Sequence, residues 1–201
     1  MAIKLFGIAQ SRAHRSLWAI EETGVDYEHV QTTFGKDSKS EEYLAVNPNG
    51  RVPALMDGDL KLFESMAINL YLTKKYAPDL FPQDIEGEAK ANQWSVWAIS
   101  EIEPLQMQMV MQKVFTPKEK RDQSVIDAAT KGLDRPLNVI NSALEESQYL
   151  LGDSFTVADL NVAGVMLLLD NMKFDYSGYP KVSEWLTRCY ERPALAKAKA
   201  L

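Results

Sequence analysis

The chain has 201 residues, of which 46% are hydrophobic and 25% charged, so it can form one large or two small globular domains. Its formal net charge of −6 disfavours binding to nucleic acid or to an anionic membrane, because both need a basic protein face. The one cysteine, Cys189, excludes an internal disulfide, a CxxC redox pair and a cysteine-rich zinc site, so we expect a cytoplasmic protein without a metal centre.

The first 76 residues alternate between strand and helix patterns. We expect strands over residues 3–8, 26–32, 53–56 and 61–63, and helices over 13–23, 40–46 and 65–76. Gly24 is a stop signal for the first helix, and Asp57-Gly58-Asp59 is typical of a hairpin turn between the last two strands. This β-α-β-α-β-β-α order requires the helices to cover the faces of one small mixed sheet.

A break follows, because residues 77–84 contain two prolines and few periodic positions, as a linker does. From Ile85 onward the pattern is helical almost to the end of the chain. The predicted fold class is therefore α/β plus all-α. We expect a thioredoxin-like domain over residues 1–77 and an all-helical domain over residues 86–201.

Residues 49–55, with the sequence Asn-Gly-Arg-Val-Pro-Ala-Leu, place Pro53 at the start of a strand, where its missing N–H is tolerated. If the Val52–Pro53 bond is cis, Val52 turns its backbone N–H and C=O outward, and an extended peptide ligand can pair with them. The alternative is a plain turn into a strand.

Glu64 and Ser65 stand where the next helix begins. The free N–H groups of a helix start and the Ser65 hydroxyl favour a carboxylate, and Glu64 can hold an ammonium group. Together they can recognise the α-amino-acid end of a ligand. The alternative is a simple N-cap with a solvated Glu64.

These two segments resemble the glutathione site of the cytosolic glutathione transferases. The motifs are Gly-Arg-Val-Pro-Ala-Leu over residues 50–55 and Leu-Phe-Glu-Ser over residues 62–65, joined by a short hairpin. The resemblance extends over the whole chain, including domain order and linker. It implies that Pro53 is cis, that Val52 pairs with the cysteinyl backbone of glutathione, and that Glu64 and Ser65 hold its γ-glutamyl end.

The same resemblance gives roles to two basic residues. Lys39 matches a position that often binds the glycine carboxylate, although a solvated lysine is an equal alternative. Arg51 stands where many relatives carry Gln and is expected to assist the ligand. The family implies a homodimer that uses glutathione as co-substrate and needs no cofactor.

Ser11 is the candidate catalytic residue. It carries the only hydroxyl in residues 7–15, where the first expected strand leads into the first expected helix. A free thiol has a pKa near ~8.5, so the enzyme must stabilise the thiolate, and a hydroxyl can do so by donating a hydrogen bond. The position resembles that of the Ser-type classes, theta- and phi-like, and the lack of a cysteine there excludes Cys-type relatives. The alternative is that Ser11 only caps the helix, with Arg12 and the helix start lowering the pKa of the thiol. His14 and His29 are expected to be structural.

The second substrate is expected to bind against the long helix after the linker. Trp97, Met107 and Met111 are the candidates for a hydrophobic co-substrate pocket, because Met and aromatic side chains form adaptable apolar walls. However, Trp94 and Trp97 lie three residues apart, a spacing that is more often found in a helical core. The identity of the substrate cannot be read from the sequence.

Residues 152–160 resemble a capping box of the same family, with Thr156 as N-cap, Asp159 reaching back to it, and Phe155 packing on Leu160. We interpret this motif as a folding device rather than a site.

The resulting hypothesis is an enzyme that conjugates the glutathione thiolate to a small hydrophobic electrophile. One alternative is a non-catalytic ligand-binding or adaptor protein of the same fold, because fold does not fix function. Another is glutathione-dependent isomerase, dehalogenase or peroxidase chemistry on the same thiolate.

Overall fold

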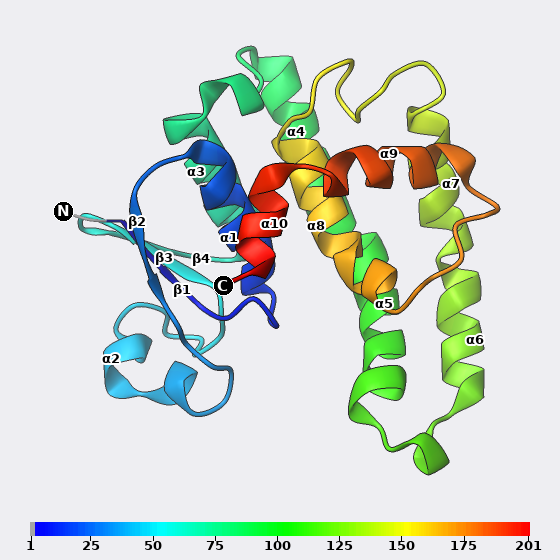
Figure 1. Cartoon of the computed structure of the whole chain (residues 1–201), viewed down its shortest axis with the longest axis horizontal. Coiled ribbons are helices and arrows are strands. Elements are labelled where there is room, and N and C mark those ends of the chain that lie inside the picture. The colour runs from blue at the N-terminus through cyan, green and yellow to red at the C-terminus, as the bar shows by residue number, and fades with distance from the viewer. Residues whose placement is uncertain (1–2) are drawn as a thin grey trace. The chain divides into compact units, whose positions relative to one another are not determined.

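The computed structural model describes residues 3–201, which form two compact units (Figure 1). The first unit runs to Glu88 and includes Glu191–Leu201, and the second is Ala89–Tyr190. The division therefore differs from the expected boundaries of 1–77 and 86–201 mainly at the C-terminus, where the last residues pack with the first unit.

The first unit holds a four-stranded mixed sheet of order β2-β1-β3-β4, in which only the β1–β2 pair is parallel. In chain order its elements are β1 (Ile3–Phe6), α1 (Ala13–Thr23), β2 (Tyr27–Val30), a 3₁₀ turn (Asp37–Lys39), α2 (Glu41–Leu44), β3 (Ala54–Asp57), β4 (Leu60–Phe63), α3 (Ser65–Tyr76) and a second 3₁₀ turn (Pro78–Leu80). The predicted thioredoxin-like β-α-β-α-β-β-α order is confirmed.

Side-chain alternation along the strands divides the core of this unit between the two faces of the sheet. Leu5 and Leu55 are ladder partners and are fully buried, on the face opposite to Phe6 and Ala54. Phe6 and Ala54 instead pack in a cluster with Tyr43 of α2, whose ring meets the Phe6 ring edge-on at 5.8 Å. Helices α1 and α3 pack against each other. The sheet thus holds the starts of α1 and α3 in fixed positions.

Helix α10 (Pro193–Lys199) packs on α1 (Figure 1). Arg192, just before it, donates from Nε and Nη2 to the two carboxylate oxygens of Glu22, each at 2.6 Å. Leu195 and Ala198 are buried. The sequence period identifies a helix but not the unit on which it packs.

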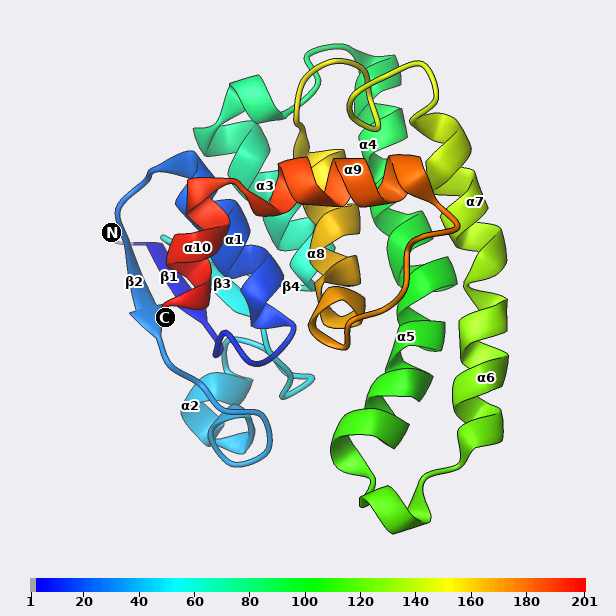
Figure 2. The same ribbon diagram turned by 45° about the vertical axis from the view of Figure 1, so that its right-hand side comes forward.

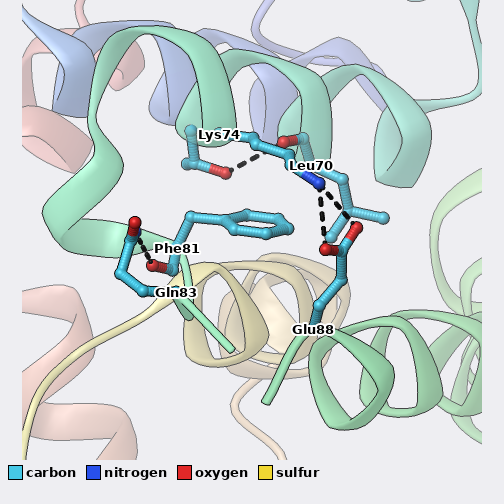
Figure 3. Close-up of polar contacts among 6 residues, drawn as sticks. Leu70, Lys74, Phe81, Gln83 and Glu88 are labelled. Atoms are coloured by element: carbon cyan, nitrogen blue, oxygen red, sulfur yellow. Dashed lines mark hydrogen bonds and ion pairs between the residues drawn. The ribbon is translucent and has the colours of Figure 1, made fainter. Parts of the chain in front are cut away.

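The segment that follows α3, residues 77–88, contacts that helix through Lys74 (Figure 3). Lys74 lies over the Phe81 ring at 5.1 Å and donates to both carboxylate oxygens of Glu88 at 2.8 and 2.9 Å. Gln83 donates to the carbonyls of Pro78 and Phe81. The predicted linker is therefore an ordered part of the first unit, and Phe81 is buried in it.

Asp57, at the end of β3, ties the hairpin to the C-terminal half of α3. Its Oδ2 accepts hydrogen bonds from Tyr71 and Tyr76, each at 2.6 Å, and from Lys75 at 2.7 Å. Burial raises the pKa of Asp57, but the bonds from Lys75 and the two tyrosines outweigh it and lower the pKa to about 2. The ionised carboxylate therefore stabilises the fold.

We expect Asp57→Asn to lower the free energy of unfolding at neutral pH and to have little effect near pH 2. The folded-state pKa lies below the ordinary value of 3.8, so the stabilisation is complete above 3.8 and is lost as the pH falls through about 2. Urea unfolding at both pH values measures the difference, with Asp59→Asn in the same turn as control. A difference that does not change with pH would contradict the assignment.

The second unit is helical (Figure 2). Its elements are α4 (Ile85–Trp97, which begins in the first unit), a π-helical segment (Ala98–Ile102), α5 (Glu103–Val110), a second π-helical segment (Met111–Phe115), a 3₁₀ turn (Lys118–Lys120), α6 (Gln123–Gly132), α7 (Asp134–Ala143), α8 (Val157–Asn171) and α9 (Pro180–Tyr190). Helix α5 packs against α6 and α8, and α9 packs against α7 and α8. Among residues 3–201, no helix is both long and apolar enough to cross a membrane.

The capping box at the start of α8 is confirmed. Asp159 Oδ2 accepts from the Thr156 backbone N–H at 2.9 Å and from its hydroxyl at 3.0 Å. Its Oδ1 accepts from the Leu150 N–H at 2.8 Å and from the Trp185 indole at 2.9 Å, which the sequence did not indicate. Phe155 is buried and meets the Tyr149 ring edge-on at 5.9 Å. Its predicted packing on Leu160 stays a prediction.

Candidate functional site

Three strand ends lie side by side at one edge of the sheet. Phe6 of β1 pairs with Ala54 of β3, and Ala54 pairs with Phe63 of β4. Because β3 runs antiparallel to both neighbours, the next residues beyond this row belong to the segments that follow β1, precede β3 and follow β4. The sheet register thus brings together the Ser11 loop, Val52-Pro53 and Glu64-Ser65, which are far apart in the sequence.

Gly7 is the point of closest approach between the first two of these segments. It has a φ of +139°, and a methyl group added to it would lie 2.3 Å from the Ala13 Cβ and 3.5 Å from the Val52 Cβ. Only glycine fits this conformation and space. Ala13, the first residue of α1, and Val52 therefore both lie against Gly7, and Ser11 stands in the loop between Gly7 and Ala13.

The Val52–Pro53 peptide bond is cis, as the sequence analysis expected. Among residues 3–201, the Val52 backbone N–H and C=O have no hydrogen-bond partner. The preceding carbonyl, of Arg51, accepts from the Tyr43 hydroxyl at 2.6 Å and from the Asn47 amide at 2.7 Å. Burial raises the pKa of Tyr43 to about 12, although the hydrogen bond with Asn47 lowers it, so the hydroxyl stays a donor. These two supports fix the backbone around Val52.

Glu64, rather than Ser65, is the N-cap of α3, and Ser65 is the first helical residue. Glu64 adopts a φ of 72°, a left-handed conformation that is uncommon for a residue other than glycine and is often found at binding sites. Its exposed side chain makes no capping bond, so the first N–H groups of the helix are left uncapped by it. The Ser65 side chain is buried beside them.

Ser11 lies in the loop between β1 and α1, and its hydroxyl is both donor and acceptor. Its Oγ donates to the Ile8 carbonyl at 2.7 Å and accepts from the Ala13 N–H at 3.1 Å. The second bond satisfies the N–H of Ala13, the first residue of α1, although the N-cap of this helix is Arg12. It does not exclude catalysis, because the hydroxyl proton can turn toward a ligand while the Ala13 bond stays.

Lys39 reaches the same region from the end of its 3₁₀ turn. Its Nζ donates to the Asn49 carbonyl at 3.4 Å, and its side chain passes over Gly50, next to Arg51. The side chains of Lys39 and Arg51 are both exposed. The Lys39 ammonium group therefore lies over Gly50, two residues before Val52, and Arg51 directly precedes Val52 in the chain.

Known protein families and relatives match the chain over most of its length. The family model for the glutathione S-transferase N-terminal domain matches residues 1–74, and that for the C-terminal domain matches residues 103–193. Glutathione S-transferase 1 of Zea mays is 35% identical over 99% of this chain and 96% of its own length. The chain belongs to the glutathione S-transferase family.

Solved structures of glutathione S-transferases agree with this fold. The theta class enzyme from Xanthomonas axonopodis pv. citri, with glutathione bound, has a TM-score of 0.91 and 31% identity, covering 100% of this chain and 98% of that one. Glutathione S-transferase I from mais, in complex with an atrazine glutathione conjugate, has a TM-score of 0.88 and 35% identity, covering 100% and 97%. The predicted family, fold class and transferase function are confirmed, and the roles of the individual site residues remain predictions.

The three residues expected in the co-substrate pocket of this transferase lie along one helical stretch. Trp97 ends α4, is half-buried and meets the Trp94 ring edge-on at 5.1 Å. Met107 is half-buried on α5, and Met111 is 50% exposed at the start of the second π-helical segment. The two methionines are four residues apart and share a helix face. Trp97 instead packs against Trp94, as a core residue does.

Gly50 offers a test of the packing under Lys39. Gly50 and Gly58 have φ values of +58° and +60°, so alanine costs each about 1 kcal/mol of backbone strain. Only at Gly50 would the new methyl collide, at 2.8 Å from the Ser38 carbonyl oxygen and 2.7 Å from the Lys39 Nζ. We expect Gly50→Ala to lower the free energy of unfolding by about 2–3 kcal/mol and Gly58→Ala by about 1 kcal/mol. Equal losses in denaturant titrations would contradict this packing.

Proposed function

We propose that this transferase binds glutathione along the edge formed by residues 50–65 and conjugates its thiolate to a small hydrophobic electrophile. The observation that carries the proposal is the Val52 backbone, whose N–H and C=O are unpaired among residues 3–201 beside the Ser11 loop. Unpaired backbone groups on a nearly buried residue are unfavourable unless water or a ligand pairs with them. The cysteinyl part of glutathione, an extended peptide, supplies one acceptor and one donor.

The γ-glutamyl end of glutathione fits the start of α3. Its carboxylate is attracted by the uncapped N–H groups and by the Ser65 hydroxyl, with the helix dipole adding to the attraction. Its ammonium group is held by the exposed carboxylate of Glu64. At the other end of the peptide, Lys39 and Arg51 are placed to attract the glycine carboxylate.

Ser11 is the proposed catalytic residue. Its hydroxyl turns from the Ile8 carbonyl to the glutathione sulfur and stabilises the thiolate, which lowers the pKa of the thiol. The Ile8 carbonyl then still accepts the Ser11 backbone N–H at 3.0 Å, so the change leaves no buried acceptor without a partner. The Ala13 N–H keeps its bond to Oγ and makes the hydroxyl a better donor.

In the conjugation step, a sulfur–carbon bond forms and the leaving group departs with its electron pair. The thiol proton goes to solvent before the attack. Trp97, Met107 and Met111 are the proposed apolar wall for the electrophile. The binding of an atrazine glutathione conjugate by the relative from mais supports an electrophile of this class.

We further propose a cytoplasmic, detoxifying homodimer. The lone buried cysteine suits a reducing compartment. Leu60 and Phe63 are 39% and 38% exposed on the edge strand β4, and a second subunit would cover them.

The test is a conjugation assay with glutathione and 1-chloro-2,4-dinitrobenzene. The proposal predicts saturable formation of the aryl glutathione conjugate. Glutathione binding without turnover of this substrate or of an organic hydroperoxide would instead favour a ligand-binding protein. Turnover of the hydroperoxide alone would favour peroxidase chemistry.

A further inference from the structure

We infer that His29, assisted by His14, is a positioning residue that holds the Ser11 loop in its catalytic geometry. The inference rests on the proposed role of Ser11, through which both histidines act. Both residues were expected from the sequence to be merely structural. In the structure, each ring donates a hydrogen bond to a carbonyl at one end of the loop.

His29 anchors the first end of the loop from β2. Its Nε2 lies 2.8 Å from the Gly7 carbonyl oxygen, and since a carbonyl only accepts, Nε2 must carry the proton. The other donor to this oxygen, the Thr32 N–H, lies at 3.5 Å, beyond the usual range of such bonds. His29 is the ladder partner of Leu5 in β1, so the sheet fixes where its ring stands. The imidazole therefore supplies the main bond that holds the Gly7 carbonyl.

His14 anchors the second end from the first turn of α1. Its Nδ1 lies 2.7 Å from the Ser11 carbonyl oxygen and must also be the protonated nitrogen. The backbone N–H of His14 donates to the same oxygen at 3.1 Å. The His14 side chain is buried, which limits its freedom to move.

Between these anchors, the Ala13 N–H, 3.1 Å from the Ser11 Oγ, also holds the loop. Its internal bonds run from Ser11 N and Oγ to the Ile8 carbonyl, and the second is given up when the hydroxyl turns to the sulfur. Gly7 cannot move toward Ala13, because there is no room even for a methyl group between them. The two imidazoles thus fix the loop when its internal bonding is weakest. A small displacement of a catalytic group has a large effect on rate.

The two histidines offer matched variants. The side-chain nitrogen of glutamine can reach the place of Nε2, and that of asparagine can reach the place of Nδ1. His29→Gln therefore keeps the donor to Gly7, whereas His29→Leu removes it. His14→Asn and His14→Leu form the corresponding pair at the Ser11 carbonyl.

The experiment titrates the glutathione-saturated enzyme and follows thiolate absorbance in the ultraviolet to obtain the pKa of the bound thiol. It is combined with kcat and KM for the aryl halide assay. We expect His29→Leu to raise the pKa of the bound thiol by about one and to lower kcat about tenfold, with KM for glutathione nearly unchanged. His29→Gln should restore both values. A merely structural histidine would not produce this rescue with an unchanged KM.

Two results separate failure of this inference from failure of the proposed function. If Ser11→Ala changes the pKa of the bound thiol but His29→Leu does not, or if His29→Leu and His29→Gln behave alike, the inference is wrong. If Ser11→Ala changes neither pKa nor kcat, the proposed role of Ser11 fails and the inference with it. Should His29→Leu not fold, the His14 pair tests the same inference from the other end of the loop.

Discussion

We expect Ser11→Ala to lower kcat/KM for aryl halide conjugation about 100-fold, while the dissociation constant of glutathione changes little. The loss is of the size seen when one hydrogen-bond donor to a developing or stabilised anion is removed. Binding persists because it depends on Val52, Glu64 and Ser65, with which Ser11 makes no hydrogen bond in the described structure. The substitution also removes the acceptor for the Ala13 N–H, which costs about 1 kcal/mol of stability.

Ser16→Ala is the matched control for this prediction. Ser16 lies on α1, is fully buried, and its Oγ has no partner among the described residues. Removing this hydroxyl should leave activity and stability near those of the wild type. If Ser11→Ala lowers the melting temperature but leaves kcat unchanged, Ser11 is a helix cap and not a catalytic residue.

The second large effect is expected in the helical unit, where Asp159→Ala should lower the free energy of unfolding by about 3 kcal/mol or more. The carboxylate accepts four hydrogen bonds, and alanine would leave the buried Trp185 indole and the Leu150 N–H without an acceptor. Burial raises the pKa of Asp159 and the four donors oppose that shift. A helix cap alone contributes about 1 kcal/mol, so the contacts with Trp185 and Leu150 account for the rest of the expected loss.

Chemical denaturation of Asp159→Ala and Asp153→Ala provides the comparison. Asp153 lies in the bend before α8 and is exposed, so its replacement should cost less than about 0.5 kcal/mol. A loss below about 1 kcal/mol for Asp159→Ala would mean that the contacts with Trp185 and Leu150 contribute little.

Elements with clear end signals could be predicted to the residue. Helix α1 has its predicted bounds and ends before Gly24, which adopts a left-handed conformation. Helix α3 also has its predicted bounds. Strands β1 and β2 are shorter than expected, β3 is shifted by one residue and β4 begins one residue early, because apolar content does not mark where pairing starts or stops. At β1 the strand ends at Phe6, since Gly7 turns the chain with a φ of +139°.

Contacts between distant segments could not be predicted in the same way. The motif Gly-Arg-Val-Pro indicates that Val52 is a candidate binding residue. It does not indicate that Tyr43 and Asn47 donate hydrogen bonds to the Arg51 carbonyl. The bond from His29 to the Gly7 carbonyl joins residues that are 22 positions apart, and it depends on the register of β1 and β2. Likewise, α10 has an ordinary helical pattern, which does not indicate that it packs on α1 or that Arg192 pairs with Glu22.

Calorimetric titration with glutathione tests the central claim, that residues 50–65 hold this peptide. We predict saturable binding to the wild type, unchanged binding to Glu42→Gln, an exposed glutamate on α2, and about tenfold weaker binding to Glu64→Gln, because a charge-assisted bond to the ammonium group is lost. An absence of binding to the wild type, or equal affinity for the two variants, would contradict the account.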